Sequence, residues 1–239
     1  KRDVVQLIND QLPSYKPGSI NRVIILLRYM FNLAIKWEVD GVIRNPTAGI
    51  PLLKENNQVE RFLSSEEAKA LLVAIKNSKN PMLQHIISML ILTGARKREV
   101  LDAKWEDFDM ERKIWRIPTT KAGKARIVPL SDTASVLLIK LRQRKRCAYA
   151  FANPATLKPY RSVYYSWHTA RKEAGLSDVR VHDLRHSFAS FLVNAGRSLY
   201  EVQTLLGHTQ IKTTQRYAHL STTSLRSASN EISLAVPEL

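Results

Sequence analysis

The sequence has few of the residues that cross-link secreted proteins or interrupt regular structure. Among its 239 residues there is one cysteine, Cys147, which excludes an intrachain disulfide and favours a reducing compartment. The 8 glycines and 10 prolines are too few for a low-complexity chain, and the hydrophobic content of 44% suits an ordinary core. We therefore expect a globular protein of one large or two small domains, located in the cytoplasm.

Long hydrophobic runs are also missing. The most apolar stretch, RVIILLRYMFNLAI, is interrupted by Arg28 and Asn32, and no run approaches the roughly eighteen residues of a membrane span. We expect no membrane span. The chain shows no signal peptide and begins with Lys1 rather than Met, so we expect a fragment of a longer protein.

Acidic residues are scarce. The chain has 21 Asp and Glu against 37 Lys and Arg, a net charge of +16. Between Arg112 and Lys172, fifteen basic residues accompany one acid, Asp132. This excess predicts a nucleic-acid partner rather than a membrane surface, because no basic amphipathic helix with a clear Trp/Phe/Leu face accompanies it. The basic residues that we expect to contact DNA are Lys124, Arg126, Arg144, Lys145, Arg146 and Arg161.

The segment from Val181 to His219 concentrates the chemistry. Arginine and histidine can hold and polarise a phosphate, and tyrosine can attack one. His182, Arg185 and His186 stand at i, i+3 and i+4, so they share one face of a helix. His208 and Tyr217 follow. The alternative is that these residues belong to two amphipathic helices and make only structural hydrogen bonds.

Periodicity and caps predict a mainly α protein with a small antiparallel β-sheet, an α+β fold. Ser64 with Glu67 and Ser198 with Glu201 form capping boxes, the second before a helix over 199–206. The other expected helices are 2–11, 19–37, 80–92, 96–103, 133–142, 161–174 and one after His182, with strands in KIWRIPT and ARIVPL.

The motifs HDLRHSFAS, LLGH and TTQRYAH, in this order, resemble the C-terminal signature of the tyrosine recombinases, the phage integrase family. The resemblance predicts an arginine after a TG pair, which TGARKREV supplies as Arg96, and a hairpin lysine, which TKAGKARIVPL supplies as Lys121. It covers roughly 21–219. It implies part of a helical core-binding domain at 1–54, a linker at 55–62, and a catalytic domain at 63–239.

The resemblance also implies roles for the catalytic candidates. Tyr217 attacks the DNA phosphate, giving a 3′-phosphotyrosyl bond and a free 5′-hydroxyl, while Arg96 and Arg185 bind the phosphate oxygens. Lys121 is the acid for the leaving oxygen, His182 accepts the tyrosine proton, and His208 donates to a non-bridging oxygen. No metal, ATP or other cofactor is implied.

Structural alternatives accompany these roles. Arg96 can pair with Glu99 and Arg185 with Asp183, and Lys121 can be a plain phosphate contact. A zinc site of His182, His186, His208 and Cys147 is disfavoured. Asp183 stands where an HExxH site needs Glu, and Arg185 opposes a cation.

The resemblance predicts a site-specific recombinase of a mobile element, whose partners are double-stranded DNA attachment sites. It implies a homotetramer on two duplexes, a monomer when free, and room for an accessory DNA-bending protein. The alternatives are relaxation of DNA by a type IB topoisomerase and a non-catalytic DNA-binding protein of the same fold. We expect residues 221–239 to dock on a neighbouring protomer, with a cap on their own domain as the alternative.

Overall fold

The computed structural model describes residues 1–55, 61–118 and 125–221. The chain divides into two compact units, Lys1–Val59 and Glu60–Leu239. The division lies within the predicted linker at 55–62, and the assignment of the first unit to a core-binding domain stays a prediction. Lys121, Lys124 and residues 222–239 of the predicted tail lie outside the described residues.

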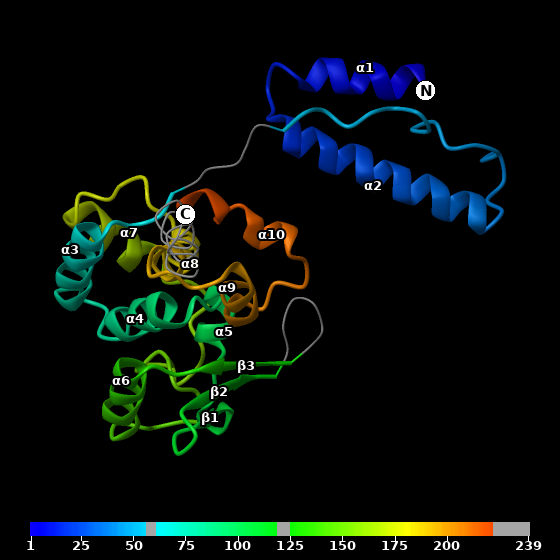
Figure 1. Cartoon of the computed structure of the whole chain (residues 1–239). Helices are drawn as coiled ribbons and strands as arrows, with labels where there is room; N and C mark the ends of the chain where they lie inside the picture. Colours follow the sequence, from blue (N-terminus) through cyan, green and yellow to red (C-terminus); the bar gives the residue numbers. More distant parts are fainter. Residues whose placement is uncertain (56–60, 119–124, 222–239) are drawn as a thin grey trace, which may run out of the picture. The chain divides into compact units, whose positions relative to one another are not determined.

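The first unit contains two helices and a returning segment (Figure 1). Helix α1 spans Arg2–Gln11 and α2 spans Pro17–Lys36. Helix α2 begins two residues before the predicted start at Ser19, because Pro17 occupies the first turn, where its fixed φ suits a helix. The chain then runs back along α2, and the Asn21 side-chain amide donates to the Leu53 carbonyl at 2.9 Å. The buried residues of this unit are Val4, Ile8, Ile20, Ile24 and Ile50.

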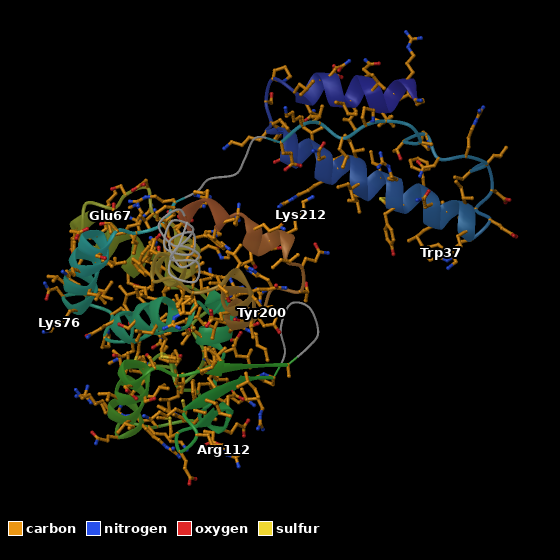
Figure 2. The ribbon with its side chains drawn as sticks, viewed as in Figure 1. Trp37, Glu67, Lys76, Arg112, Tyr200 and Lys212 are labelled. Carbon is orange, nitrogen blue, oxygen red and sulfur yellow. The ribbon has the colours of Figure 1, made fainter. Side chains whose placement is uncertain are left out.

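Much of the apolar surface of α2 is exposed. Leu26 is 57% exposed, and Trp37, labelled after the end of the helix in Figure 2, is 68% exposed. By length and mean hydropathy, 1.2, α2 is the one helix among the described residues that would reach across a membrane. Core helices of proteins without any membrane segment reach the same values, so this observation is weak evidence for a span.

The second unit is mainly helical, and α4 (Leu83–Thr93) is its central helix. Its side chains Leu83, Ile86, Ile87 and Met89 are fully buried. Helix α4 packs against α3, α6 and α8, while α9 packs against both α8 and α10. The remaining bounds are α3 Ser65–Lys76, α5 Lys97–Leu101, α6 Asp132–Arg142, α7 Tyr164–Glu173, α8 Asp183–Asn194, α9 Leu199–Leu206 and α10 Lys212–Gln215.

A three-stranded antiparallel sheet lies at one side of this helical body (Figure 1). Its strands are β1 (Phe108–Asp109), β2 (Ile114–Ile117) and β3 (Arg126–Pro129), in the order β1-β2-β3. Trp115 pairs with Val128, and both side chains are buried in the core. The predicted fold class, mainly α with one small antiparallel sheet, is confirmed.

Local sequence signals set several of the helix ends. The capping boxes of Ser64 with Glu67 and of Ser198 with Glu201 are both formed, and α9 has the predicted bounds. Gly94 ends α4 and Gly207 ends α9, each in the left-handed conformation, with φ of 60° and 66°. Glycine adopts this conformation without the steric cost of a Cβ. These two turns lead into the functional site.

Candidate active site

Arg185 is the buried centre of the site, at 4% exposure. Its guanidinium donates from Nη1 to the Gly94 carbonyl and from Nη2 to the Leu206 carbonyl, each at 2.6 Å. Both carbonyls lie at the C-terminal end of a helix, where the aligned peptide dipoles favour a cation. The ends of α4 and α9 therefore hold this guanidinium in place.

Asp183 does not pair with Arg185, the alternative that the sequence suggested, but with Arg180. Asp183 is fully buried and pairs with Arg180, whose Nη2 lies 2.6 Å from Oδ1. The Asp183 carboxylate also accepts the Arg180 backbone N–H at 2.7 Å, which fixes the start of α8. Arg185 is thus anchored by backbone carbonyls.

Arg96 does form the alternative ion pair with Glu99. Arg96 Nη1 lies 2.9 Å from Glu99 Oε1, and the Arg96 backbone N–H donates to Oε2 at 2.7 Å. Arg126 approaches the same carboxylate, with Nη2 2.8 Å from Oε2, and donates from Nη1 to the Leu205 carbonyl at 2.6 Å. Glu99 therefore orients two arginines from different elements.

This pairing changes the interpretation of Arg126. The sequence predicts Arg126 as a DNA contact, whereas its side chain is only 10% exposed and is held by Glu99 and the end of α9. Arg126 is the first residue of β3, and its bonds to the Leu205 carbonyl and to Glu99 bring this end of the strand against α9 and α5. Arg126 is therefore part of the cluster of arginines around Glu99.

The site is rich in uncompensated positive charge. Burial, reinforced by the charges of Arg96 and Arg126, lowers the pKa of Arg185 to about 9. Burial and the charges of Arg185 and Arg96 likewise lower the pKa of His208 to about 4. A bound anion would relieve this repulsion, which is the electrostatic signature of a phosphate site.

Tyr217 lies in the same unit with its ring buried, at 5% exposure. It packs in a small apolar cluster with Ala189 and Val193 of α8 and Val202 and Leu206 of α9. Its hydroxyl lies 2.5 Å from Nδ1 of His186. The nucleophile predicted from TTQRYAH is therefore held against α8 by packing and by an imidazole.

The remaining predicted histidines flank this pair. His208 follows the Gly207 turn, and its Nδ1 lies 2.8 Å from Thr214 Oγ1. His182 precedes α8, and its ring meets the ring of His186 edge-on at a centroid distance of 5.0 Å. Partial burial and the charge of Arg185 lower the pKa of His182, although much of its surface is exposed.

Several predicted DNA contacts lie elsewhere. Arg144, Lys145 and Arg146 are exposed after α6 and line a separate pocket with His85. Arg161 is exposed in the segment before α7. Among the described residues, no group of three or more His, Cys, Asp or Glu side chains is placed to hold a metal ion.

Two contacts of the site, one made by Glu99 and one by His186, were not predicted from the sequence. Glu99 was named only as the partner of Arg96, and its contact with Arg126 joins positions 27 residues apart. His186 was considered for zinc because of its spacing from His182, whereas its hydroxyl partner lies 31 residues away. The i, i+4 spacing placed His186 on the correct face but could not identify that partner.

Comparison with known proteins identifies the family of the chain. The family model described as "Phage integrase family" matches residues 61–224. The integrase of Salmonella phage P22 is 32% identical over 199 residues, covering 76% of this chain and 50% of that protein. The tyrosine recombinase XerC of Staphylococcus epidermidis is 31% identical over 224 residues, covering 88% of this chain and 74% of that protein.

A solved structure shares the fold. The Tn1549 transposon integrase, in complex with a circular intermediate DNA, superposes with a TM-score of 0.77 at 19% identity, covering 97% of this chain and 84% of that one. The present chain spans half the length of the P22 integrase. From the matched residues and the XerC relative, the chain belongs to the phage integrase family of tyrosine recombinases, enzymes that cleave and rejoin DNA.

Proposed function

We propose that this chain carries out site-specific DNA recombination with Tyr217 as its nucleophile. The observation that carries the proposal is the convergence of a buried tyrosine hydroxyl and a cluster of cationic groups on α8 and the turns after α4 and α9. Arg185 and Arg96 bind the non-bridging oxygens of the scissile phosphate. His208, fixed by Thr214, donates to one of them.

The reaction is a transesterification. Tyr217 Oη gives its proton to a neighbouring imidazole and forms a bond to phosphorus as the bond from phosphorus to O5′ breaks, leaving a 3′-phosphotyrosine and a 5′-hydroxyl. Lys121, which lies in the sequence between β2 and β3, supplies the proton to O5′. A 5′-hydroxyl of a second duplex then reverses the step on a new partner. Because the phosphodiester energy stays in the phosphotyrosine, ATP is not consumed.

The partners follow from this chemistry. Exchange between two duplexes requires four cleavages, so we propose a homotetramer on two double-stranded attachment sites, assembled from chains that are monomeric without DNA. The basic residues after α6 contact the backbone away from the cleavage point, and an accessory protein can bend the DNA. We place the enzyme in the cytoplasm, where mobile-element DNA is found.

The proposal is tested by trapping the covalent complex. Fragmented host and element DNA carrying random nicks is incubated with the chain, and adducts that survive SDS are recovered and sequenced. A nick beside the cleavage point releases the 5′-hydroxyl fragment, so the phosphotyrosine cannot be reversed and the DNA site is identified. Tyr217→Phe should retain DNA binding and form no adduct, while Tyr200→Phe, an exposed tyrosine on α9, should behave as the native chain.

The same assay separates the alternatives. We expect adducts to form in excess EDTA, because the arginines stabilise the charge that a metal would otherwise neutralise. An SDS-stable adduct with Tyr217→Phe would overturn the nucleophile assignment. Relaxation of a supercoiled plasmid that lacks the recovered site, without strand exchange between two copies of the site, would indicate the topoisomerase reaction.

A further inference from the structure

His186 contacts the hydroxyl of Tyr217, the proposed nucleophile. Its Nδ1 lies 2.5 Å from Tyr217 Oη, and the two rings are 5.9 Å apart at an interplanar angle of 48°. This distance is short for a hydrogen bond between a phenol and an imidazole. None of the six residues assigned to catalysis above accounts for it.

Packing holds both partners of this contact. His186 lies in the first turns of α8, and Tyr217 packs against Ala189 and Val193, which follow on the same helix. The tyrosine ring also contacts α9 through Val202 and Leu206. The hydroxyl therefore meets Nδ1 because the ring has little freedom to move away.

The protonation state of His186 suits an acceptor. Burial, followed by the charges of His182 and Arg216, lowers its pKa to about 4, so the ring is neutral at pH 7. A neutral imidazole carries one proton, and the tautomer protonated at Nε2 leaves a lone pair on Nδ1. In that tautomer the Tyr217 hydroxyl donates to Nδ1.

We propose that His186 accepts the proton of Tyr217 during DNA cleavage, a refinement that rests on the proposed function. As Oη bonds to phosphorus and the bond to O5′ breaks, the proton moves from Oη to Nδ1, and O5′ takes a proton from the separate acid. The ring of His182 lies 5.0 Å from that of His186, centroid to centroid, so its charge state influences the pKa of His186.

The low pKa of the free ring couples this transfer to DNA. An imidazole that titrates near pH 4 is a weak base, but a phosphate arriving beside it brings negative charge, which raises the pKa of a neighbouring cationic acid. Proton transfer is then favoured only when the phosphate is present. The charged and titratable groups that act on His186 are His182, Asp183, Arg180, Arg216, His208 and Tyr217.

The first test compares two His→Asn variants by their rates of cleavage of the nicked DNA site that adduct capture recovers. His186→Asn keeps a polar group near the position of Nδ1 but cannot take a proton, and His168→Asn changes a histidine on α7 outside the site. We expect His186→Asn to keep its melting temperature and DNA binding and to lose about 10²–10⁴ in cleavage rate at pH 7, as is typical for a lost acid–base group. His168→Asn should cleave at the native rate.

The pH profile separates a base from a structural residue. If His186 takes the proton, the defect of His186→Asn shrinks as pH rises toward about 10, where tyrosine ionises unaided. A defect of the same size at every pH, or native cleavage at pH 7, would overturn the proposal. The same profile from His182→Asn, with His186→Asn unaffected, would assign the base to His182.

A sulfur substrate distinguishes the nucleophile from the leaving group. Replacing O5′ at the cleavage point by sulfur gives a thiolate that departs without a proton. We expect this substrate to relieve the defect of Lys121→Ala and to leave that of His186→Asn unchanged. Restoration of native cleavage to His186→Asn would place His186 on the leaving-group side and refute the assignment.

One measurement uses the native chain and does not depend on a variant that folds. Nitrogen-15 NMR of labelled histidines reports which ring nitrogen carries the proton. Nδ1 of His186 should be unprotonated at pH 7, whereas a proton on Nδ1 contradicts the proposal. Failure of the proposed function would be seen in a separate experiment, as an SDS-stable adduct formed by Tyr217→Phe. The histidine experiments do not involve that variant, so the two failures are distinguishable.

Discussion

At the scale of single residues, Glu99 is the nearly buried carboxylate that pairs with two arginines of the site. Its carboxylate is 6% exposed and lies between the guanidinium groups of Arg96 and Arg126. Burial acts to raise the pKa of Glu99, but Arg126 and the hydrogen bonds from both arginines outweigh it, and the pKa is lowered. The carboxylate is therefore charged at neutral pH, and it fixes two cations that would otherwise repel each other.

Glu99→Gln should lower the free energy of unfolding by roughly 2–4 kcal/mol, because a buried arginine loses its counter-charge while its desolvation remains. Glu106→Gln is the control, since that carboxylate is 74% exposed and its solvent-screened pair with Lys104 contributes little to stability. Urea unfolding measures both. Equal losses for the two variants would show that the Glu99 network contributes no more than a surface pair.

At the scale of elements, the two glycine turns position the arginines. Gly94 presents the carbonyl that receives Arg185, and Gly207 lies against the Arg126 side chain. A Cβ added at Gly207 would come within 2.5 Å of Arg126 Cδ. The end of α9 and the guanidinium of β3 can approach this closely only because the turn residue has no side chain.

Gly207→Ala should therefore reduce stability by roughly 1–3 kcal/mol, combining the cost of a left-handed alanine with displacement of Arg126. Gly196→Ala is the matched control, with φ of 78° and no atom within 4 Å of the added Cβ. It should show the conformational cost alone and retain cleavage. If both variants lose the same stability and keep full cleavage, the close approach to Arg126 is unimportant.

At the scale of the whole molecule, the charge distribution governs DNA binding. The stretch from Arg112 to Lys172 has a balance of +14, and its exposed members after α6 lie outside the catalytic cluster. Such residues release counterions from DNA without touching the reacting phosphate. They should add affinity that depends on salt and not on sequence.

Binding of a nicked duplex should weaken by about 10³–10⁵ between roughly 50 and 200 mM salt, as expected for six to ten neutralised phosphates. Fluorescence anisotropy over this range gives the slope. Lys145→Gln and Arg146→Gln should each reduce the slope by about one while leaving the adduct rate at saturating DNA unchanged. A slope that does not respond to either substitution would place these residues away from DNA.

The half-buried histidines of the site make the folded molecule sensitive to acid. His186 and His208 have their pKa lowered to about 4, against an ordinary value near 6.5, so the unfolded chain binds more protons between these limits. Stability should thus be full above pH 6.5 and fall as the pH drops toward 4. The pKa difference is about 2.5 units, so at ~1.4 kcal/mol for each unit a ring contributes at most about 3.5 kcal/mol.

Urea unfolding at pH 7.5, 6 and 5 would measure this loss, and the pH dependence should be smaller for His186→Phe, which keeps an aromatic ring but cannot titrate. Carboxylates contribute little above pH 5, since their ordinary pKa values lie lower. Stability that rises as the pH falls from 7.5 to 5 would contradict the burial of these rings.

The sequence by itself determined the features that depend on neighbouring residues. The capping box of Ser198 with Glu201 and the bounds of α9 follow from contacts three or four residues apart, so the local pattern was enough to predict them. The order of the motifs around Arg96, Arg185 and Tyr217 was likewise enough to identify the family. The predicted start of α2 at Ser19 is wrong by two residues, because Pro17 is the first residue of the helix.

Tertiary structure alone decided which groups meet in the site. Arg185 reaches a carbonyl 91 residues away at Gly94, and Tyr217 reaches a histidine 31 residues away. From the sequence, Asp183 is a partner for Arg185 because it lies two residues away, whereas His182 is a proton acceptor for Tyr217 only through the family resemblance. Each polar group is satisfied by whichever acceptor the packed helices bring within about 3 Å, and that choice depends on how α4, α8 and α9 cross, which spacing along one helix does not encode.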